Sequence, residues 1–249
     1  MYVFEQGTGA DVIVLHGANP VDYFDALVAA LVPNHRVLVP HMPGWGKSPE
    51  MDAGQDYTAT NAALREALAE RGVTRAAVVG YSLGGWRALE LALSGSFDIT
   101  AVYLLSTFTA SPTPEVRERY GEYAELARSE SDMRPDVRDL YLAPDFAARN
   151  PEIHRRVTEW VYACPRDVFA RELDAIAEMP DLGPSLPDLV APVVARSGTL
   201  DIAAPPHWSR EIVESVPDGR LELAQGCGHA LLYEDREATI GSILSSVGG

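Results

Sequence analysis

Short apolar runs alternate with helical patterns along the first half of the chain. The runs are rich in β-branched residues and apolar at consecutive positions, as strands covered by helices on both faces are. They lie at Val12–Leu15, Val37–Val39, Ala76–Val79 and Ile99–Leu105. Between them, Thr58–Glu70 and Leu83–Leu93 repeat Ala and Leu at three- and four-residue spacing, which predicts two helices.

The same alternation returns near the end of the chain. Val193–Ala195 and Leu221–Leu223 have the strand pattern, while Pro206–Ser215 and Ala230–Ser245 have the helical one. Strands that alternate with helices predict a mostly parallel sheet flanked by its crossover helices. The pattern therefore predicts an α/β fold.

Residues 107–187 interrupt this alternation. They show almost no strand signal, carry Glu and Arg at helical spacing, and are punctuated by prolines at positions 112, 114, 135, 144, 151, 165, 180, 184 and 187. We predict several short helices here, inserted as a cap into a core formed by residues 1–106 and 188–249. The aromatic residues of this block either line the roof of a pocket or hold the short helices together. Among them we single out Tyr123 and Trp160 as substrate-binding candidates.

The sharpest chemical signal is the run Gly80-Tyr81-Ser82-Leu83-Gly84-Gly85. It matches G-x-S-x-G and lies between a predicted strand and a predicted helix, where this motif forms a nucleophile elbow. The sharp backbone bend leaves no room for a Cβ at the flanking glycines and exposes the serine hydroxyl above the sheet. Short glycine motifs also occur by chance, so the strand–turn–helix context carries the prediction of Ser82 as nucleophile. Tyr81 is a further substrate-binding candidate.

Two backbone N–H groups are candidates for an oxyanion hole. The Leu83 N–H would lie at a helix N-terminus, where a developing negative charge is stabilised. His16-Gly17-Ala18 follows the first buried strand, and the N–H after that glycine, from Ala18, would be the second donor. His16 is either a catalytic base or a structural residue; we favour a side chain that holds the loop by a hydrogen bond.

A general base is expected late in the chain, because the triad order on this scaffold is Ser, acid, His. Only His229 combines a late position with a loop after a strand, Ala-Gln-Gly-Cys-Gly-His. His35 and His154 read as surface residues, His41 belongs to a Pro-Gly loop, and His207 begins a polar helix. His229 is therefore the predicted base.

The orienting acid is expected after the preceding strand. Asp201 is the first carboxylate after Val193–Ala195, and an acid there would accept the Nδ1–H bond of the histidine and fix its tautomer. Asp188 and Asp218 are competing carboxylates that fit turns better. The alternative role for Asp201 is to cap the helix that begins near Pro205.

Composition narrows the classes of function. The 249 residues are 47% hydrophobic, which suffices for one large core. With 36 acidic and 20 basic residues, the net charge of −16 disfavours nucleic acid and membrane surfaces as partners and favours a neutral or apolar small-molecule substrate.

Gly46-Lys47-Ser48 suggests a phosphate loop, but that motif requires glycine where His41 stands. Lys47 is the only lysine and lies in this loop, which disfavours Schiff-base chemistry.

The two cysteines, Cys164 and Cys227, are too few for a disulfide framework or a cysteine zinc site, and the sequence leaves a single bridge between them open. We expect no metal and no cofactor. The N-terminal segment lacks a basic start and a long apolar run, and no stretch approaches the ~20 apolar residues of a membrane helix. The expectation is a cytoplasmic protein, with a homodimer left open.

Taken in order and spacing, His16-Gly17, the Pro43–Ser48 loop, the Gly80–Gly85 elbow, Asp201 and Gly228-His229 resemble the α/β-hydrolase superfamily. The resemblance covers nearly the whole chain, with the middle block in the place of the helical cap. It is similar to the branch of small esterases, enol-lactonases, carbon–carbon bond hydrolases and cofactor-free haloperoxidases. The resemblance implies an eight-stranded, mostly parallel sheet, here with its first strands shortened to about Tyr2–Glu5. One departure is His41, where many relatives have an aspartate.

The expected activity is hydrolysis of a small, largely apolar ester or lactone through an acyl-enzyme on Ser82. A carbon–carbon bond hydrolase or lyase could use the same three residues. A non-catalytic receptor for a small ligand on the same fold is the alternative from another class, because fold alone does not determine function.

Overall fold

The computed structural model describes residues 1–50, 56–129, 140–160, 162–163, 165–177 and 179–248. Within them, seven strands form one sheet in the order β1-β3-β2-β4-β5-β6-β7. β1 is antiparallel to β3, and every other neighbouring pair is parallel, which confirms the predicted α/β class. The strands are β1 (Val3–Gln6), β2 (Ala10–Leu15), β3 (His35–Pro40), β4 (Arg75–Tyr81), β5 (Asp98–Leu105), β6 (Val193–Gly198) and β7 (Gly219–Ala224).

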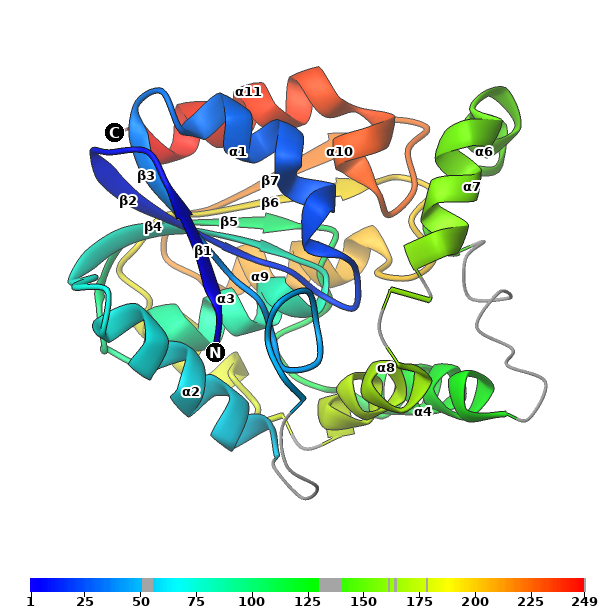
Figure 1. Ribbon diagram of the computed structural model, residues 1–249, viewed down its shortest axis with the longest axis horizontal. Coiled ribbons are helices and arrows are strands. Elements are labelled where there is room, and N and C mark those ends of the chain that lie inside the picture. The colour runs from blue at the N-terminus through cyan, green and yellow to red at the C-terminus, as the bar shows by residue number, and fades with distance from the viewer. Residues whose placement is uncertain (51–55, 130–139, 161, 164, 178, 249) are drawn as a thin grey trace.

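Helices cover both faces of the sheet (Figure 1). One face is covered by α1 (Asp25–Leu31), α10 (Leu231–Glu234) and α11 (Arg236–Val247), and the other by α2 (Tyr57–Ala69), α3 (Leu83–Leu93) and α9 (Pro206–Ser215). The sequence pattern placed α3 and α9 at these same bounds. It did not indicate α1 or the short 3-10 helix η1 (Val21–Phe24) ahead of it.

The observed elements depart from the expected ones in two places. The described sheet has seven strands rather than eight, because the segment ahead of Ala10 holds only β1 and a turn through Gly7 and Gly9, both at positive φ. The single helix predicted for Ala230–Ser245 is broken into α10 and α11 at Asp235, whose φ of −143° is not helical. The Asp235 carboxylate pairs with Arg196 of β6, and this contact outside the helix favours the break.

The insertion, residues 107–187, connects β5 to β6 and contains no strand in its described part. Figure 1 shows its helices beyond the ends of the β5 and β6 arrows, at the carboxyl edge of the sheet. Proline occupies the first turn of α4, α6 and α7, where its missing N–H costs no hydrogen bond. The elements are α4 (Pro114–Arg128), α6 (Pro144–Arg149), α7 (Pro151–Trp160), α8 (Arg166–Asp174), η3 (Ala175–Ala177) and η4 (Gly183–Asp188).

A buried ion pair ties the insertion to the core. Arg87 of α3 lies 2.6 Å from Glu172 of α8, and their side chains are only 3% and 7% exposed. The Trp45 indole N–H donates to the other Glu172 oxygen at 2.5 Å. The pair therefore joins α3, the loop around Trp45 and the insertion at one point.

Candidate active site

Ser82 lies at the sharp turn between β4 and α3. Its φ of 52° is in the left-handed region, which is uncommon for a residue other than glycine and costs conformational energy. A Cβ at Gly80 would lie 2.4 Å from the Gly84 carbonyl, and one at Gly84 would lie 2.2 Å from the Leu15 carbonyl. The predicted exclusion of side chains at these glycines is confirmed, and this bent backbone holds the serine at the helix N-terminus.

The loop after β2 closes against this turn. A Cβ at Gly17 would lie 3.0 Å from the Ser82 Cβ and 3.1 Å from Leu83 N, so the two backbones are in contact. The buried Asn19 side chain accepts a 2.9 Å hydrogen bond from Gly17 N and fixes the loop. Among the described residues, neither the Ala18 N–H nor the Leu83 N–H donates a recorded hydrogen bond. Both groups are candidate donors to an oxyanion.

His16 holds this loop in one tautomer. Its Nδ1 lies 2.7 Å from the Gly17 carbonyl, which can only accept, and its Nε2 accepts from Met42 N at 2.8 Å. The ring is therefore neutral with its proton on Nδ1. Burial lowers the pKa of His16 to about 3, in agreement with these contacts. The prediction of a structural hydrogen bond is confirmed.

His229 and Asp201 form a buried pair. The His229 Nδ1 lies 2.8 Å from an Asp201 oxygen, and the two side chains are 2% and 0% exposed. The loops that carry them are in backbone contact, because a Cβ at Gly198 would lie 2.1 Å from the Gly228 carbonyl. The contact orients the imidazole so that its Nε2 is left for other chemistry.

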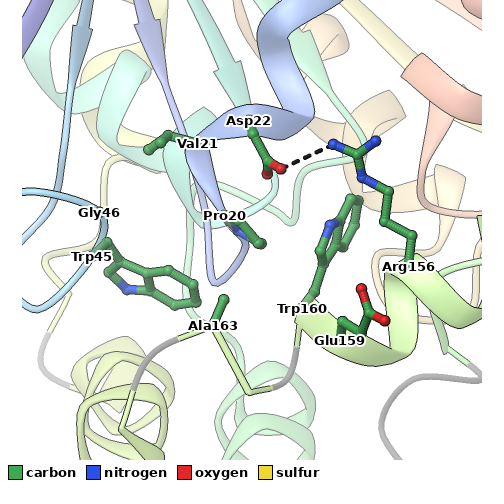
Figure 2. Close-up of a pocket in the computed structure, with 9 residues that line it drawn as sticks. All are labelled: Pro20, Val21, Asp22, Trp45, Gly46, Arg156, Glu159, Trp160 and Ala163. Atoms are coloured by element: carbon green, nitrogen blue, oxygen red, sulfur yellow. Dashed lines mark hydrogen bonds and ion pairs between the residues drawn. The ribbon is translucent and has the colours of Figure 1, made fainter.

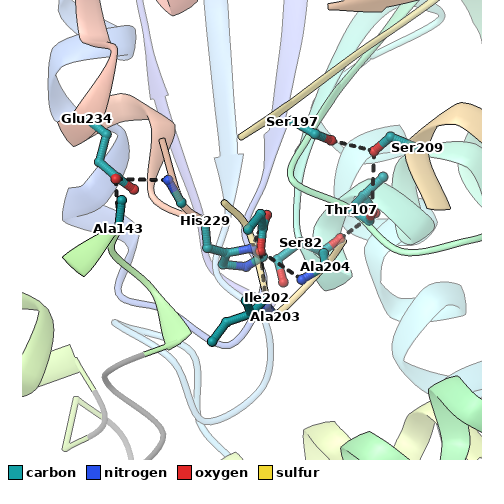
Figure 3. Close-up of polar contacts among 12 residues, drawn as sticks. Ser82, Thr107, Ala143, Ser197, Ile202, Ala203, Ala204, Ser209, His229 and Glu234 are labelled. Atoms are coloured by element: carbon teal, nitrogen blue, oxygen red, sulfur yellow. Dashed lines mark hydrogen bonds and ion pairs between the residues drawn. The ribbon is translucent and has the colours of Figure 1, made fainter. Parts of the chain in front are cut away.

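The second Asp201 oxygen accepts from the N–H groups of Ala203 and Ala204, at 3.0 and 2.8 Å (Figure 3). It therefore shapes the turn that follows β6, while the residue at the N-terminus of α9 is Pro205 rather than Asp201. The two competing carboxylates, at positions 188 and 218, are exposed. Of the three carboxylates considered from the sequence, only Asp201 contacts His229.

Ser82 and His229 border the same small pocket, of about 30 Å³. Figure 3 shows the two side chains next to each other. No hydrogen bond between them is recorded among the described residues; such bonds commonly tighten only in the substrate complex. The remaining lining comes from Ala18, Leu83, Ala203 and the insertion residues Tyr120, Tyr123, Leu140, Tyr141, Phe169 and Leu173.

The three substrate-binding candidates differ in position. Tyr123 lines this pocket, whereas the structure does not bring Tyr81 or Trp160 to its lining. Tyr81 is the last residue of β4, and its buried ring packs 5.0 Å from that of His229. Trp160 packs against Tyr23, with 4.9 Å between ring centroids.

Trp160 lines a second, separate pocket of about 280 Å³. Figure 2 shows Trp45 and Trp160 on opposite sides of it, with Pro20 between them. An exposed ion pair joins Arg156 to Asp22 at 2.9 Å beside this pocket. Neither Ser82 nor His229 belongs to its lining, so the larger cavity is not the one beside the candidate nucleophile.

Sequence reasoning did not single out Tyr120, Tyr141 or Phe169 as pocket residues. They belong to the same aromatic-rich insertion as Tyr123, and no periodicity separates aromatic residues that face a pocket from those that hold helices together. Tyr141 also contacts the His229 ring, with 5.7 Å between centroids. Only the packing of the insertion on the core distinguishes these side chains.

Other candidate residues have structural surroundings. His35 is buried, and its ring contacts the Leu31 carbonyl at 3.2 Å, so the surface position expected for it is wrong. Cys227 is a free thiol, and burial raises its pKa to about 11. Cys164 lies outside the described residues. The described part of the chain has no helix long and apolar enough to cross a membrane, and no cluster of three or more His, Cys, Asp or Glu side chains able to hold a metal.

Known proteins share this architecture. A 2-hydroxy-6-oxononadienedioate/2-hydroxy-6-oxononatrienedioate hydrolase of Klebsiella pneumoniae is 26% identical in sequence to this chain. The alignment covers 96% of this chain and 87% of the Klebsiella protein. The enol-lactonase of Burkholderia xenovorans superposes with a TM-score of 0.88 at 22% identity, covering 100% of this chain and 96% of its own. A thermophilic esterase of Thermogutta terrifontis superposes with a TM-score of 0.87 at 22% identity, covering 98% of this chain and 91% of its own.

The model of the alpha/beta hydrolase family matches residues 12–241, from within β2 to the middle of α11. The match spans the elbow, the insertion and the loops of Asp201 and His229. Together with the hydrolase relative and the seven-stranded sheet, it identifies the protein: the chain is an enzyme of the alpha/beta hydrolase family.

Proposed function

We propose that this hydrolase cleaves a small, uncharged, largely apolar ester or lactone, with Ser82 as nucleophile, His229 as general base and Asp201 as the orienting acid. The observation that carries the proposal is the buried 2.8 Å contact between His229 and Asp201 beside a serine held at positive φ. A strained serine at a helix N-terminus, next to a carboxylate-oriented imidazole, is the arrangement of an activated nucleophile.

In the proposed reaction, His229 Nε2 takes the Ser82 hydroxyl proton while Oγ attacks the carbonyl carbon. The negative charge on the carbonyl oxygen is stabilised by the N–H groups of Leu83 and Ala18. As the tetrahedral intermediate collapses, the ester or ring C–O bond breaks, and the protonated His229 donates its proton to the leaving alcohol oxygen. Water, activated by the same imidazole, then cleaves the acyl-enzyme and restores Ser82.

The lining of the pocket supports an uncharged substrate. Apart from Ser82 and His229, the lining residues are apolar side chains and three tyrosines, with no Arg or Lys among the described residues that form it. A carboxylate bound there would lose its hydration without an opposite charge, which is costly. The relative from Klebsiella pneumoniae is named for a dienedioate, which carries two carboxylates; the described residues that line this pocket offer no matching cation.

The three tyrosine hydroxyls are not equivalent. Tyr120 donates to the Ala203 carbonyl at 3.4 Å, and Tyr141 donates to the Ala18 carbonyl at 3.2 Å. Among the residues that the structure describes, no hydrogen bond is recorded for the Tyr123 hydroxyl, and Tyr123 also lines the pocket. Tyr123 is therefore our candidate for a single polar contact to the substrate, beside otherwise apolar walls.

We propose further that residues 107–187 act as the cap that selects the substrate. Six of the eleven pocket-lining residues belong to this block, whereas the three proposed catalytic residues belong to the core. Changes in the insertion should therefore alter substrate preference, and changes at Ser82 should abolish turnover of every substrate.

Hydrolysis of a carbon–carbon bond is the second candidate. It is favoured by the relative from Klebsiella pneumoniae, which is similar to 96% of this chain and is named for a 2-hydroxy-6-oxo acid. The same three residues could act on such a vinylogous 1,5-diketone acid. The two candidates differ in the charge and length that the pocket must accept.

A substrate panel tests these candidates. Short p-nitrophenyl esters, uncharged γ- and δ-lactones and a vinylogous 1,5-diketone acid would be assayed on the wild type and on Ser82→Ala. We expect ester or lactone turnover that disappears in Ser82→Ala. Turnover of the diketone acid at a kcat/KM above that of every ester and lactone would reject the first candidate in favour of the second.

A further inference from the structure

The insertion passes directly over the loop that carries His229. We call Tyr141–Ala143 the strap and residues 225–230 the histidine loop. The backbone N–H groups of His229 and Ala230 both donate to the Tyr141 carbonyl, at 3.1 and 2.9 Å. The backbone N–H of the proposed base is therefore held by a carbonyl of the insertion, while its carbonyl accepts from Leu231 N at 3.1 Å.

Glu234 makes the second connection between the strap and the histidine loop. One oxygen, Oε2, accepts from Ala143 N in the strap and from Gly228 N in the histidine loop, each at 2.9 Å (Figure 3). The other oxygen, Oε1, is buried without a hydrogen-bond partner among the described residues. A single oxygen thus receives an N–H from each of two segments that are far apart in sequence.

The strap and the histidine loop lie so close together that a side chain at position 228 would not fit between them. A Cβ at Gly228 would lie 2.6 Å from Ala143 N and 3.1 Å from Glu234 Oε1. Glu234 ends the four-residue helix α10, and its carboxylate reaches back past His229 and across to the strap. This geometry differs from a local helix cap, because neither N–H partner belongs to α10.

The strap also reaches the candidate oxyanion loop. The Tyr141 hydroxyl donates to the Ala18 carbonyl at 3.2 Å, while its ring lies 5.7 Å from that of His229. The position of the strap is therefore coupled to both the general base and one oxyanion donor. A displaced strap would move both groups relative to Ser82.

We infer that Glu234 is a positioning residue of the active site, which fastens the strap to the histidine loop so that His229 and Ala18 are placed together. This inference rests on the proposed serine mechanism for its effect on rate. Glu234 touches no reacting atom; it acts through the backbone on either side of His229. The chemistry requires only one accepting oxygen at the Oε2 position, and it does not require the negative charge.

Because only an accepting oxygen at the Oε2 position is required, two substitutions of Glu234 should have different effects on kcat. Glu234→Gln keeps a carbonyl oxygen for both N–H groups and places its amide where Oε1 has no partner, so kcat should stay within about threefold of the wild type. Glu234→Leu has a similar size and no acceptor, and kcat should fall about 10- to 100-fold, as expected for a catalytic group shifted by a fraction of an ångström to 1 Å. Because the carboxylate binds no substrate, KM should change less than kcat.

Ala143→Pro removes the strap donor from the other side. Ala143 has φ −59° and ψ 137°, which proline can adopt; the substitution deletes the N–H, and its ring carbon takes the place of that hydrogen and displaces the Glu234 carboxylate from the strap. It should lower kcat in the same way, and the double variant Ala143→Pro/Glu234→Leu should be scarcely slower than the worse single variant. The exposed Glu237 on α11 supplies the control, because Glu237→Leu should leave kcat unchanged.

Two measurements on purified, full-length protein keep this inference separate from the proposed function. Urea unfolding of the two single variants and the double variant tests the connection without reference to activity; additive changes in unfolding midpoint would overturn it. Steady-state kcat on the best substrate, measured where circular dichroism shows folded protein, tests the effect on rate. Wild-type kcat in folded Glu234→Leu, or an equal loss in Glu234→Gln, would overturn the positioning role. Absence of all hydrolysis in the wild type would reject the proposed function and leave the unfolding test to decide on the connection.

Discussion

We expect Glu172→Gln to destabilise the protein strongly, although it changes one atom. Glu172 is the only partner recorded for the Arg87 guanidinium among the described residues, at 2.6 Å. The Arg87 Nε and Nη1 atoms are buried without hydrogen-bond partners, and the nearest further support is the Tyr57 ring, 5.6 Å away. Removal of the negative charge therefore leaves a buried cation without its recorded ion-pair partner.

The magnitude follows from the burial. With side chains only 3% and 7% exposed, loss of one partner of such a pair costs about 3–5 kcal/mol. This is a large part of a typical stability of about 5–15 kcal/mol. For a chain of this size, about 2–4 °C are lost per kcal/mol, so Tm should fall by roughly 6–20 °C. The Arg75–Asp98 pair is 68% and 61% exposed, and Asp98→Asn should cost less than about 1 kcal/mol.

Urea titrations of the wild type, Glu172→Gln and Asp98→Asn measure the three free energies of unfolding. The double variant Arg87→Met/Glu172→Met separates loss of the charge from loss of the contact, because removal of both charges should restore most of the stability lost in Glu172→Gln. A Glu172→Gln protein within about 1 kcal/mol of the wild type would refute the reasoning. So would a double variant less stable than that single variant, since the uncompensated charge would then not be the cause.

Four further outcomes are expected. Ser82→Ala and His229→Ala should each lower kcat by about 10³-fold or more, and the double variant should be scarcely slower, as steady-state assays on one ester would show. Asp201→Asn should stay folded and lose about 10³- to 10⁴-fold in kcat, because the amide supports the wrong histidine tautomer; near wild-type kcat would place the acid elsewhere. Tyr123→Phe should raise KM about 2- to 12-fold with kcat unchanged, the loss of one hydrogen bond. Burial lowers the pKa of His16 from 6.5 to about 3, so between these pH values the unfolded chain binds one more proton than the folded chain. The free energy of unfolding should therefore fall by up to about 1.4 kcal/mol per pH unit as pH falls. In urea titrations at pH 6, 5 and 4, His16→Gln should show a shallower dependence of that free energy on pH.

Sequence patterns predicted the core where local and long-range preferences agree. The run Ala76–Val79 is apolar on both faces and becomes the central strand β4, and the pattern of Leu83–Leu93 becomes α3 at the same bounds. The pattern failed where a side chain acts across the fold. Residues 230–245 have a continuous helical period, yet Asp235 breaks the helix, and its carboxylate pairs with an arginine that precedes it by 39 residues.

Candidate site residues were foreseen where they follow strand ends. Ser82, Asp201 and His229 each come directly after a predicted strand, and parallel strands end at the same edge of a sheet, so proximity follows from topology. Tyr141 and Glu234 lacked such a signal. Tyr141 contributes a main-chain carbonyl and a hydroxyl, and Glu234 reads as an ordinary acidic residue in a short helix.

The contrast has a physical origin in the way the two parts of the site are held. Backbone contact fixes the core loops to one another: Gly198 meets Gly228 with no room for a Cβ, and Gly17 meets the Ser82 turn, where a Cβ would lie 3.0 Å from the Ser82 Cβ. Side chains, among them Glu172 on α8 and Glu234, fix the insertion to that core together with the main-chain carbonyl of Tyr141. A glycine required by close packing leaves a mark in the sequence, whereas a glutamate that joins two distant segments looks like any surface acid. If the insertion is the cap that we propose, its residues can change the substrate preference without changing the core chemistry, provided that the two glutamates keep their partners.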